Sequence, residues 1–411
     1  MTSPGTVRMM ETKENSKINK NSKNNGQTVD NRTDNAKSQA MIRKSLTIAI
    51  SLFAFCLIMC LVLIFVVSKR IEANNGADAQ IKLSAQGGFS CEYSEAQKLY
   101  PYADGCIKVT SERIAYLTLS GSEVFSYSVS YQNPQCVICG SNVAVFDRDG
   151  YGFTVLNETG VWYSKPSEDP IKAVQISSKG FAAVISGNSE SFGEVLLYDE
   201  KGNQLAEWTS YNSGFPLCCA FNDDSTQMAV STINTSGAVI VPYVRVFSID
   251  KNDKGYEVTD NAVYTTDDGI IFASVCYLGD KLYCFTANSL YEAVNGNLSM
   301  VNFDFSAIGY VKLVNKNLFI TYSDGISQLN KLAIINSSDN MIYNSDIGAN
   351  INCVASNDAF YAISVDRRIF VFNTSGVIVN DLSVDEEIIR MNFLAGDKLC
   401  VVSTGGVHTV T

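Results

Sequence analysis

Residues 136–147 read CVICGSNVAVFD, two short apolar segments joined by a polar Gly-Ser-Asn turn. The same hairpin pattern recurs in seven further places, at residues 98–110, 173–186, 218–232, 273–286, 310–322, 351–364 and 390–403. Short apolar runs that are closed by turn residues are typical of β-strands, and no long amphipathic helical stretch interrupts them. The chain from about Lys98 onward is therefore predicted to be all-β.

A second hairpin pattern lies between the copies of the first, at residues 114–128, 153–165, 194–210, 244–260, 289–303, 332–346 and 369–382. Together the two patterns give four strands per unit. The units follow one another at a mean step of about 42 residues, the length expected of one four-stranded propeller blade. In this interpretation the first hairpin links the last strand of one blade to the first strand of the next, and the second hairpin lies within a blade.

The two ends of the repetitive region complete the predicted ring. Strands are expected at residues 399–403 and 407–410 after the last full unit, and at residues 89–93 and 98–102 before the first. A blade assembled from both ends would leave no open radial edge in the ring. We therefore expect a β-propeller of about eight blades within residues 96–411, with seven blades and extra flanking strands as the alternative.

Three stretches resemble known propeller families. SGFPLCCAFNDDSTQMAVST (213–232) is similar to the most recognisable stretch of a bacterial family of unknown function that is common in Gram-positive Firmicutes. LNETGVWYSKP (156–166) and YDEKGNQLAEW (198–208) resemble blades of the wider quinoprotein-like and WD40-like propellers, where a Gly turn precedes a Trp strand. The resemblance implies a membrane-anchored propeller and no particular activity, because that family has none assigned.

Residues 45–67, SLTIAISLFAFCLIMCLVLIFVV, contain no charged residue, proline or glycine. At about 1.5 Å per residue this segment is long enough to cross the hydrocarbon core of a bilayer as a helix. Nine Lys/Arg precede the segment and only Lys69 and Arg70 follow closely, which predicts a cytoplasmic N-terminus. A cleaved signal peptide, suggested by Ala77-Asp78-Ala79, is the alternative, but both the apolar run and the preceding head are too long for one.

The predicted domains follow from this segment. Residues 1–44 are rich in Asn, Lys, Ser and Thr and are expected to be a disordered cytoplasmic tail. Residues 68–95 are expected to be a juxtamembrane linker, and residues 96–411 an extracellular propeller. Eleven of the 31 basic and four of the 42 acidic residues lie before Ile71, so 20 basic and 38 acidic residues remain after it. Such an acidic body argues against nucleic acid as a partner.

His408 is the only histidine, which argues against a Ser-His-Asp triad and against zinc sites with several histidines. Residues 147–150 and 222–225 contain carboxylates, but they are expected at tight turns, where Asp, Asn and Gly are favoured. They also lack the regular ligand spacing of a calcium loop. No catalytic residue, metal site or cofactor is predicted.

Ten cysteines follow the apolar segment, and most fall within predicted strands. Cysteine packs well as a small core residue, although an exported location would also permit disulfides. The candidate disulfides are Cys91–Cys106 and Cys276–Cys284. Cys136 and Cys139 have CxxC spacing, but residues three apart in a strand point to opposite faces, which suits neither a metal nor a redox pair.

The third and fourth units are longer than the others, and their extra residues fall at 187–193, 210–216, 232–242 and 260–269. These loops are expected to share one face of the propeller, and enlarged loops on a rigid scaffold are where binding usually occurs. The predicted binding residues are the aromatic ones in or beside these loops: Phe192, Tyr211, Phe215 and Tyr243. Packing of the loops on their own blades is the alternative role for these side chains.

Two classes of function remain. The first is a non-catalytic binding or scaffold module at the cell surface, with a protein or an envelope polymer as its ligand. The second is an exported enzyme, either quinoprotein-like or carbohydrate-active. Quinone-dependent propeller dehydrogenases lock nearly every blade with a Trp, whereas this chain has only Trp162 and Trp208. Two or more carboxylates converging in the central channel would favour the enzyme.

Overall fold

The computed structural model describes residues 87–410, except 95, 254, 267–268, 295, 302, 304, 315, 326–328 and 337–340. The predicted tail (1–44) and apolar segment (45–67), and residues 68–86 of the predicted linker, lie outside the described residues. Within the described part of the chain, no helix has the length and hydropathy needed to cross a membrane.

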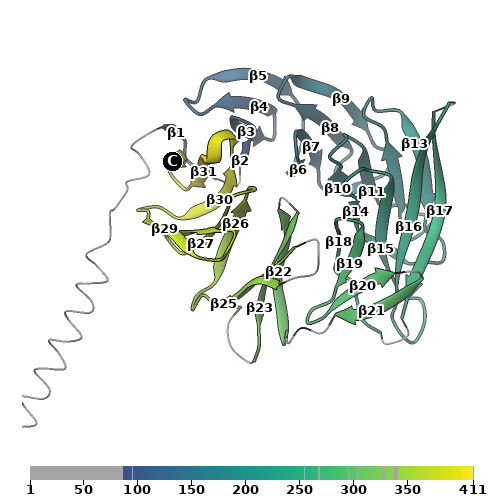
Figure 1. Cartoon of the computed structure of the whole chain (residues 1–411). Coiled ribbons are helices and arrows are strands. Elements are labelled where there is room, and N and C mark those ends of the chain that lie inside the picture. The colour runs from purple at the N-terminus through teal and green to yellow at the C-terminus, as the bar shows by residue number, and fades with distance from the viewer. Residues whose placement is uncertain are drawn as a thin grey trace, which may run out of the picture. The chain divides into compact units, whose positions relative to one another are not determined.

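The described residues form eight four-stranded antiparallel sheets arranged as a ring (Figure 1). Seven of these blades are continuous in sequence. The first four are blade 1, with β2 (Gln97–Tyr102), β3 (Gly105–Thr110), β4 (Arg113–Thr118) and β5 (Glu123–Ser128); blade 2, with β6 (Pro134–Cys139), β7 (Asn142–Asp147), β8 (Gly152–Asn157) and β9 (Gly160–Pro166); blade 3, with β10 (Ile171–Ile176), β11 (Ala182–Ser186), β12 (Glu194–Tyr198) and β13 (Gln204–Thr209); and blade 4, with β14 (Phe215–Phe221), β15 (Gln227–Asn234), β16 (Val241–Asn252) and β17 (Gly255–Thr265). The next three are blade 5, with β18 (Ser274–Leu278), β19 (Lys281–Phe285), β20 (Leu290–Val294) and β21 (Asn297–Val301); blade 6, with β22 (Ala307–Val314), β23 (Asn317–Ser323), β24 (Lys331–Asn336) and β25 (Met341–Asp346); and blade 7, with β26 (Ile351–Ser356), β27 (Phe360–Val365), β28 (Arg368–Asn373) and β29 (Ile378–Ser383).

Blade 8 combines both ends of the repetitive region. It contains β30 (Ile388–Phe393), β31 (Leu399–Ser403), β32 (Gly406–Val410) and, as its outer strand, β1 (Gly88–Ser90), with the short 3-10 helix η1 (Ala395–Asp397) between β30 and β31. β1 pairs antiparallel with β32, and Phe89 lies opposite Val407. Figure 1 accordingly shows the first strands, in blue, beside the last strands, in yellow. The prediction of eight blades closed from both ends is confirmed, and the alternative of seven blades is wrong.

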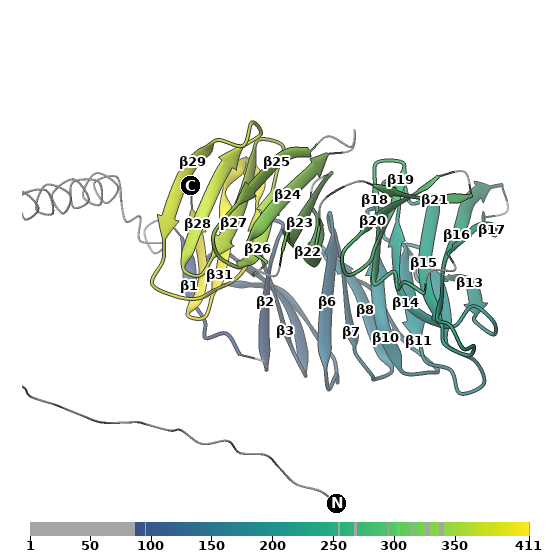
Figure 2. The same cartoon turned by 90° about the horizontal axis from the view of Figure 1, so that it is seen from below.

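Burial changes from strand to strand within a blade. The second and third strands are buried on both sides, and every residue of β7 and β12 is buried. The outer strand β5 is exposed at nearly every position. Because each blade packs against two neighbours, its middle strands need apolar residues at successive positions, and the core consists of separate clusters between adjacent blades. Figure 2 shows these blades standing side by side when the ring is seen from its edge.

The structure corrects the predicted phase of the blades. The first hairpin pattern does not link two blades: β2 pairs with β3, and β6 with β7, within single sheets. A short turn returns the chain directly alongside itself, so the two flanking strands become hydrogen-bonded neighbours. The inner strand of each blade is therefore the strand before this turn, and the blades begin one strand earlier than expected. The predicted boundary at residue 96 is also too late, because Gly88–Ser90 belong to blade 8.

Because β1 closes the ring by pairing with β32, substitution of Gly88 is expected to lower the stability of the protein. Its φ is +121°, and a Cβ at this position would lie 2.1 Å from the carbonyl oxygen of Val407. Gly160 has a φ of +141° but no atom within 4 Å of the corresponding Cβ position. Both alanine variants incur the backbone cost of a positive φ, but only Gly88→Ala also forces β1 away from β32, at about 1–3 kcal/mol.

Calorimetry of the two variants tests this difference. We expect the Tm of Gly88→Ala to be at least about 2 °C below that of Gly160→Ala. Equal melting temperatures would contradict the proposed contribution of β1 to the ring.

Candidate functional site

Four enlarged loops lie on one face of the ring. Since every strand crosses the blade from one face to the other, the loops between second and third strands share a face with the loops between successive blades. The loops in question connect β11 to β12, β13 to β14, β15 to β16, and β17 to β18. We call their shared surface the loop face. The corrected phase leaves the shared face of these loops unchanged, because moving each blade by one strand changes the names of both loop types together. The predicted loop bounds were too wide, since residues 215–216, 232–234, 241–242 and 260–265 belong to strands.

Backbone hydrogen bonds join the first two of these loops. The Phe192 amide donates to the Ser210 carbonyl at 3.0 Å, and the Ser210 amide donates to the Gly193 carbonyl at 2.9 Å. These bonds continue the pairing of β12 with β13 into the loops. The loop face therefore starts from an extended sheet rather than from independent segments.

Side chains of β15 join the loop after β13 to blade 4. Asn234 Nδ2 donates to the Asn212 carbonyl, and Thr232 Oγ1 donates to the Ser213 carbonyl, both at 2.6 Å. Gly214 permits this close approach: its φ is +82°, and a Cβ there would lie 2.0 Å from the Ile233 carbonyl oxygen. The Ser-Gly-Phe-Pro run noted in the sequence thus positions the loop against its neighbour.

Arg245 on β16 supports the same loop. Its guanidinium forms an ion pair with Asp260 and donates from Nη2 to Ser213 Oγ at 3.3 Å. Its Cζ also lies 5.5 Å from the centroid of the Trp208 ring. Charge-assisted hydrogen bonds and a cation–π contact are stronger than their neutral equivalents when they are partly desolvated. Arg245 therefore holds the last strand of blade 3 and the loop that follows it against blade 4.

The predicted aromatic residues have different environments. Tyr211 is 65 % exposed and Phe215 is 47 % exposed on the loop face. Phe192 is half-buried and packs edge-on against Phe215, with ring centroids 5.0 Å apart. Tyr243 is half-buried within β16, opposite Thr232. The structure thus brings Phe192 and Phe215 together, exposes Tyr211 as well as Phe215, and half-buries Tyr243 in β16; binding by any of them stays a prediction.

Exposed aliphatic residues, which the sequence pattern did not single out, also lie in the loops of this face. Val239 is 57 % exposed, Ile240 is 37 % exposed and Ile271 is 40 % exposed. The loop carrying Val239 lies against the loop before β18, since a Cβ at Gly269 would be 3.8 Å from Val239 Cγ1. The signal for them was an apolar run inside the loop Asn-Thr-Ser-Gly-Ala-Val-Ile. We call Tyr211, Phe215, Val239, Ile240 and Ile271 the apolar loop residues.

The eight inner strands contain no Asp or Glu, but they contain Lys98, Lys172, Lys312 and Arg390. Lys312 Nζ donates to the Val354 carbonyl at 3.4 Å, and burial lowers the pKa of this lysine. Arg390 donates to the Tyr93 hydroxyl at 3.1 Å. These strands do not supply the converging carboxylates that a carbohydrate-active site in the channel would need.

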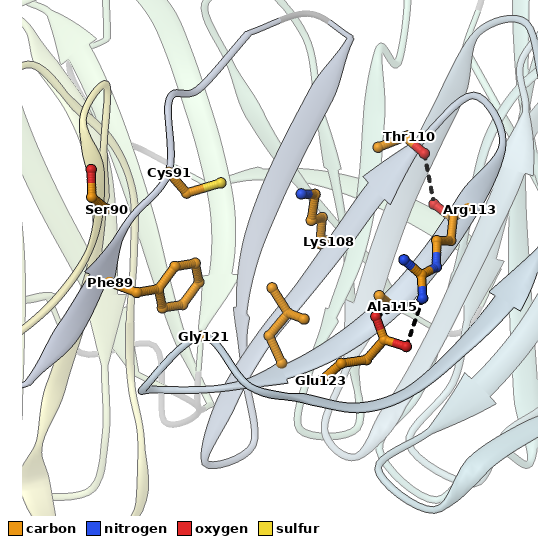
Figure 3. Close-up of a pocket in the computed structure, with 10 residues that line it drawn as sticks. Phe89, Ser90, Cys91, Lys108, Thr110, Arg113, Ala115, Gly121 and Glu123 are labelled. Carbon is orange, nitrogen blue, oxygen red and sulfur yellow. Dashed lines mark hydrogen bonds and ion pairs between the residues drawn. The ribbon is translucent and has the colours of Figure 1, made fainter.

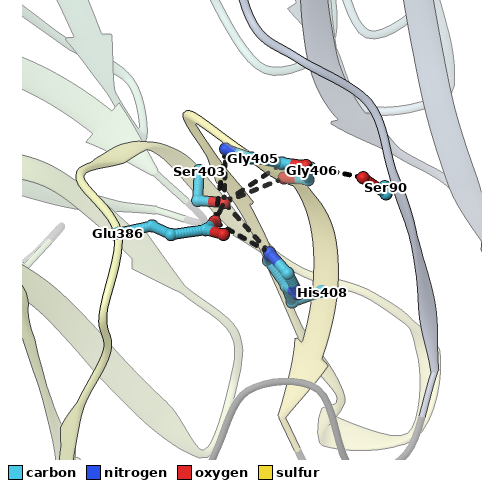
Figure 4. A network of polar contacts seen from close by, with 6 residues as sticks. All are labelled: Ser90, Glu386, Ser403, Gly405, Gly406 and His408. Carbon is cyan, nitrogen blue, oxygen red and sulfur yellow. Dashed lines mark hydrogen bonds and ion pairs between the residues drawn. The ribbon is translucent and has the colours of Figure 1, made fainter.

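His408 belongs to a polar network at the closure of the ring (Figure 4). Its Nε2 lies 3.0 Å from Ser403 Oγ and 3.3 Å from Glu386 Oε2. In a Ser-His-acid triad the serine and the carboxylate occupy opposite ring nitrogens, whereas here both face Nε2. Hydrogen bonds from Ser403 first, and then from His408, lower the pKa of Glu386. The network stabilises the turn between β31 and β32. In this turn the Gly405 carbonyl accepts a hydrogen bond from the Cys91 amide.

All ten described cysteines are free thiols. Cys276 packs in the cluster between blades 5 and 6, and Cys284 in the cluster between blades 4 and 5, so the two point to opposite sides of one sheet. This geometry does not support the predicted Cys276–Cys284 disulfide. Cys91 and Cys106 share the cluster between blades 8 and 1, but both are free thiols, so the structure shows no disulfide between them either. Within the described residues, no three His, Cys, Asp or Glu side chains are grouped as metal ligands.

Comparisons with known proteins agree with the fold. A family of unknown function, DUF5711, matches residues 82–411. No curated protein matches the sequence. The crystal structure of AztD from Citrobacter koseri is similar with a TM-score of 0.51 and 8% identity, over 71% of this chain and 87% of AztD. BamB from Moraxella catarrhalis is similar with a TM-score of 0.48 and 13% identity, over 79% of this chain and 96% of BamB. At 8% identity, the likeness to AztD indicates a shared fold alone.

The assignment of the cysteines as buried free thiols can be tested by alkylation. Burial raises the pKa of Cys136 and of Cys276 to about 12, and that of Cys218 to about 11. Because the thiolate is the reactive form, these three should resist iodoacetamide at pH 8 in the folded protein and react after unfolding in guanidinium without reductant. Peptide mass spectrometry measures both states. Cysteines that stay unlabelled after unfolding would indicate a disulfide and contradict the assignment as free thiols.

Proposed function

The chain belongs to the DUF5711 family of unknown function, and from that premise we propose that it is a membrane-anchored, extracellular binding or scaffold module whose loop face engages a protein partner. The observation that carries the proposal is the exposure of the apolar loop residues on one face of a closed ring. Exposed apolar side chains gathered in one region of a soluble domain commonly mark interaction sites.

A protein partner suits these side chains better than a sugar polymer does. Aromatic rings alone would suit either ligand, but Val239, Ile240 and Ile271 are β-branched aliphatic residues that form no hydrogen bonds through their side chains. Protein interfaces combine such an apolar centre with a few aromatic anchors that contribute most of the binding energy. Tyr211 and Phe215 are the aromatic anchors in this proposal.

The order of the loop after β13 supports a binding role. This loop is fixed by the Phe192–Ser210 and Asn234–Asn212 hydrogen bonds and by Arg245, so less conformational entropy remains to be lost there on association. Ordering of loops and side chains is among the main costs of binding. A surface that is already ordered retains more of its contact energy as affinity.

The location rests on the sequence. The charge-free segment 45–67 is proposed as the anchor, with the basic tail 1–44 in the cytoplasm. Residues 68–87 can extend over at most about 70 Å, because an extended chain spans about 3.5 Å per residue. A partner of the loop face is therefore expected among proteins of the same membrane or the adjacent envelope. The proposal contains no catalytic step, and the exported-enzyme alternative has no observation in its favour.

Substitutions on the loop face test the proposed interface. Ile240→Lys and the double variant Tyr211→Ala/Phe215→Ala place charge or remove contact area where the partner should dock. Cross-linking in native envelopes, followed by mass spectrometry, is expected to recover a defined partner with the wild type and at least about tenfold less with either variant. Val124→Lys is the matched control, because Val124 is 53 % exposed on β5 of blade 1.

Melting temperatures close to that of the wild type should accompany the loss, since the altered side chains are exposed. Full recovery of the same partner with both loop-face variants would overturn the proposal, and so would equal loss with Val124→Lys.

The proposed topology has its own test. An amine-reactive reagent that cannot cross membranes should label lysines of the propeller on intact cells but none within residues 1–44. Permeabilised cells are the control, and both regions should then react. Deletion of residues 45–67 should move the chain from the carbonate-resistant membrane fraction to the soluble fraction. Labelling of the tail on intact cells, or an unchanged fraction after the deletion, would contradict the assigned anchor.

A further inference from the structure

Lys108 occupies a position that every other blade fills with an apolar side chain. The position is in the second strand, at the same distance from the preceding turn, and faces the previous blade. In blades 2 to 8 it holds Val145, Val184, Val230, Cys284, Ile320, Ile363 and Val401, each with an exposed fraction of 0%. Lys108 is half-buried. One lysine against seven buried apolar residues is a departure from the repeat that the fold itself does not require.

A cavity of about 320 Å³ lies beside this lysine (Figure 3). Phe89 and Cys91 border it from the closing segment, and Lys108, Ala115 and Leu117 border it from blade 1. The cause is the length of β1, which has three residues, whereas the other outer strands have five or more. So short a strand leaves part of the adjoining side of blade 1 uncovered.

The charges around the cavity do not balance. Arg113 and Glu123 both border it, but they compensate each other, since Arg113 Nη2 lies 2.6 Å from Glu123 Oε1. Among the described residues, no carboxylate forms an ion pair with Lys108. Partial burial of an ammonium group is costly unless an opposite charge accompanies it. The cavity therefore presents one uncompensated positive charge above a floor made by the buried Ala115 and Leu117.

We propose that this cavity binds a small organic anion, a carboxylate or phosphate ester with an apolar body. The anionic group pairs with the Lys108 ammonium, and the apolar body lies between the Phe89 ring and Leu117. The volume is at the lower end of the range for ligand pockets, which limits the ligand to a small molecule. Phe89 is paired with Val407 through β1 and β32, so the ligand also braces the closure of the ring.

Four small molecules used as probes distinguish the contribution of charge to binding from that of apolar contact. Benzoate and phenyl phosphate carry both features, benzyl alcohol has the ring without the charge, and inorganic phosphate has the charge without the ring. With the full chain in detergent, we expect benzoate or phenyl phosphate to raise the Tm saturably, as a ligand of the folded state does. Benzyl alcohol and inorganic phosphate should bind at least tenfold more weakly, as measured by calorimetric titration.

Substitution of the lysine provides the matched control. Lys108→Val restores the residue type of the other blades, so the ligand-free variant should melt at or above the temperature of the wild type while its affinity for the anionic probe falls at least tenfold. Lys108→Met should lose the same affinity while keeping the side-chain length. The double variant Tyr211→Ala/Phe215→Ala should bind the probe as the wild type does.

Hydrogen exchange locates the bound probe. Amides of residues 87–94 and 404–409 should exchange more slowly in its presence, because the ligand braces β1 against β32. Equal affinity in Lys108→Val, equal binding of benzyl alcohol, or protection confined to the loop face would each overturn the proposal. A lower Tm of ligand-free Lys108→Val would do so as well, because the lysine would then have a structural role.

Discussion

The pairing of β1 with β32 is the contact on which the whole ring depends. Every other blade is a continuous stretch of chain, but blade 8 obtains its outer strand from residues that precede blade 1. Phe89 of this strand packs against the cluster between blades 8 and 1, which contains Leu99, Cys106 and Val402. If β1 separates, that cluster loses the cover of Phe89 and is exposed to water, which is unfavourable. A ring of blades held by clusters between neighbours thus has one junction that is not protected by chain continuity.

The same junction concentrates the irregular features of the molecule. β1 is short, and the turn between β31 and β32 is held by Ser403, Glu386 and His408 rather than by the usual turn residues alone. The cavity beside Lys108 follows from the brevity of β1, because the adjoining side of blade 1 has less to pack against. The short strand β1 weakens the closure of the ring, and the cavity that it leaves is where the proposed ligand would strengthen that closure.

The loop face obeys a different constraint. Its loops are long, yet the loop after β13 is tied to blade 4 by the hydrogen bonds of Asn234 and Thr232 and by the contacts of Arg245. Rigid loops that still expose apolar side chains are suited to binding, because contact energy is not spent on ordering. The inner strands, by contrast, carry cations and no carboxylates. The two regions therefore differ in the charge and polarity of their side chains.

The sequence alone was sufficient to predict four-stranded units, the closure from both ends and the face that carries the enlarged loops, and it left the number of blades at eight or seven. Each of these depends on the order and spacing of apolar segments, which is a property of the chain. The phase of the blades required the tertiary structure, because a turn between two apolar segments looks the same whether the strands pair or diverge, and only hydrogen-bond register distinguishes the two. The environments of Cys276 and Cys284, of Val239 and Ile240, and of Lys108 likewise required the tertiary structure. Whether such side chains are buried, exposed or beside a cavity is decided by neighbours distant in sequence, which is why the most specific sites emerged only from the folded ring.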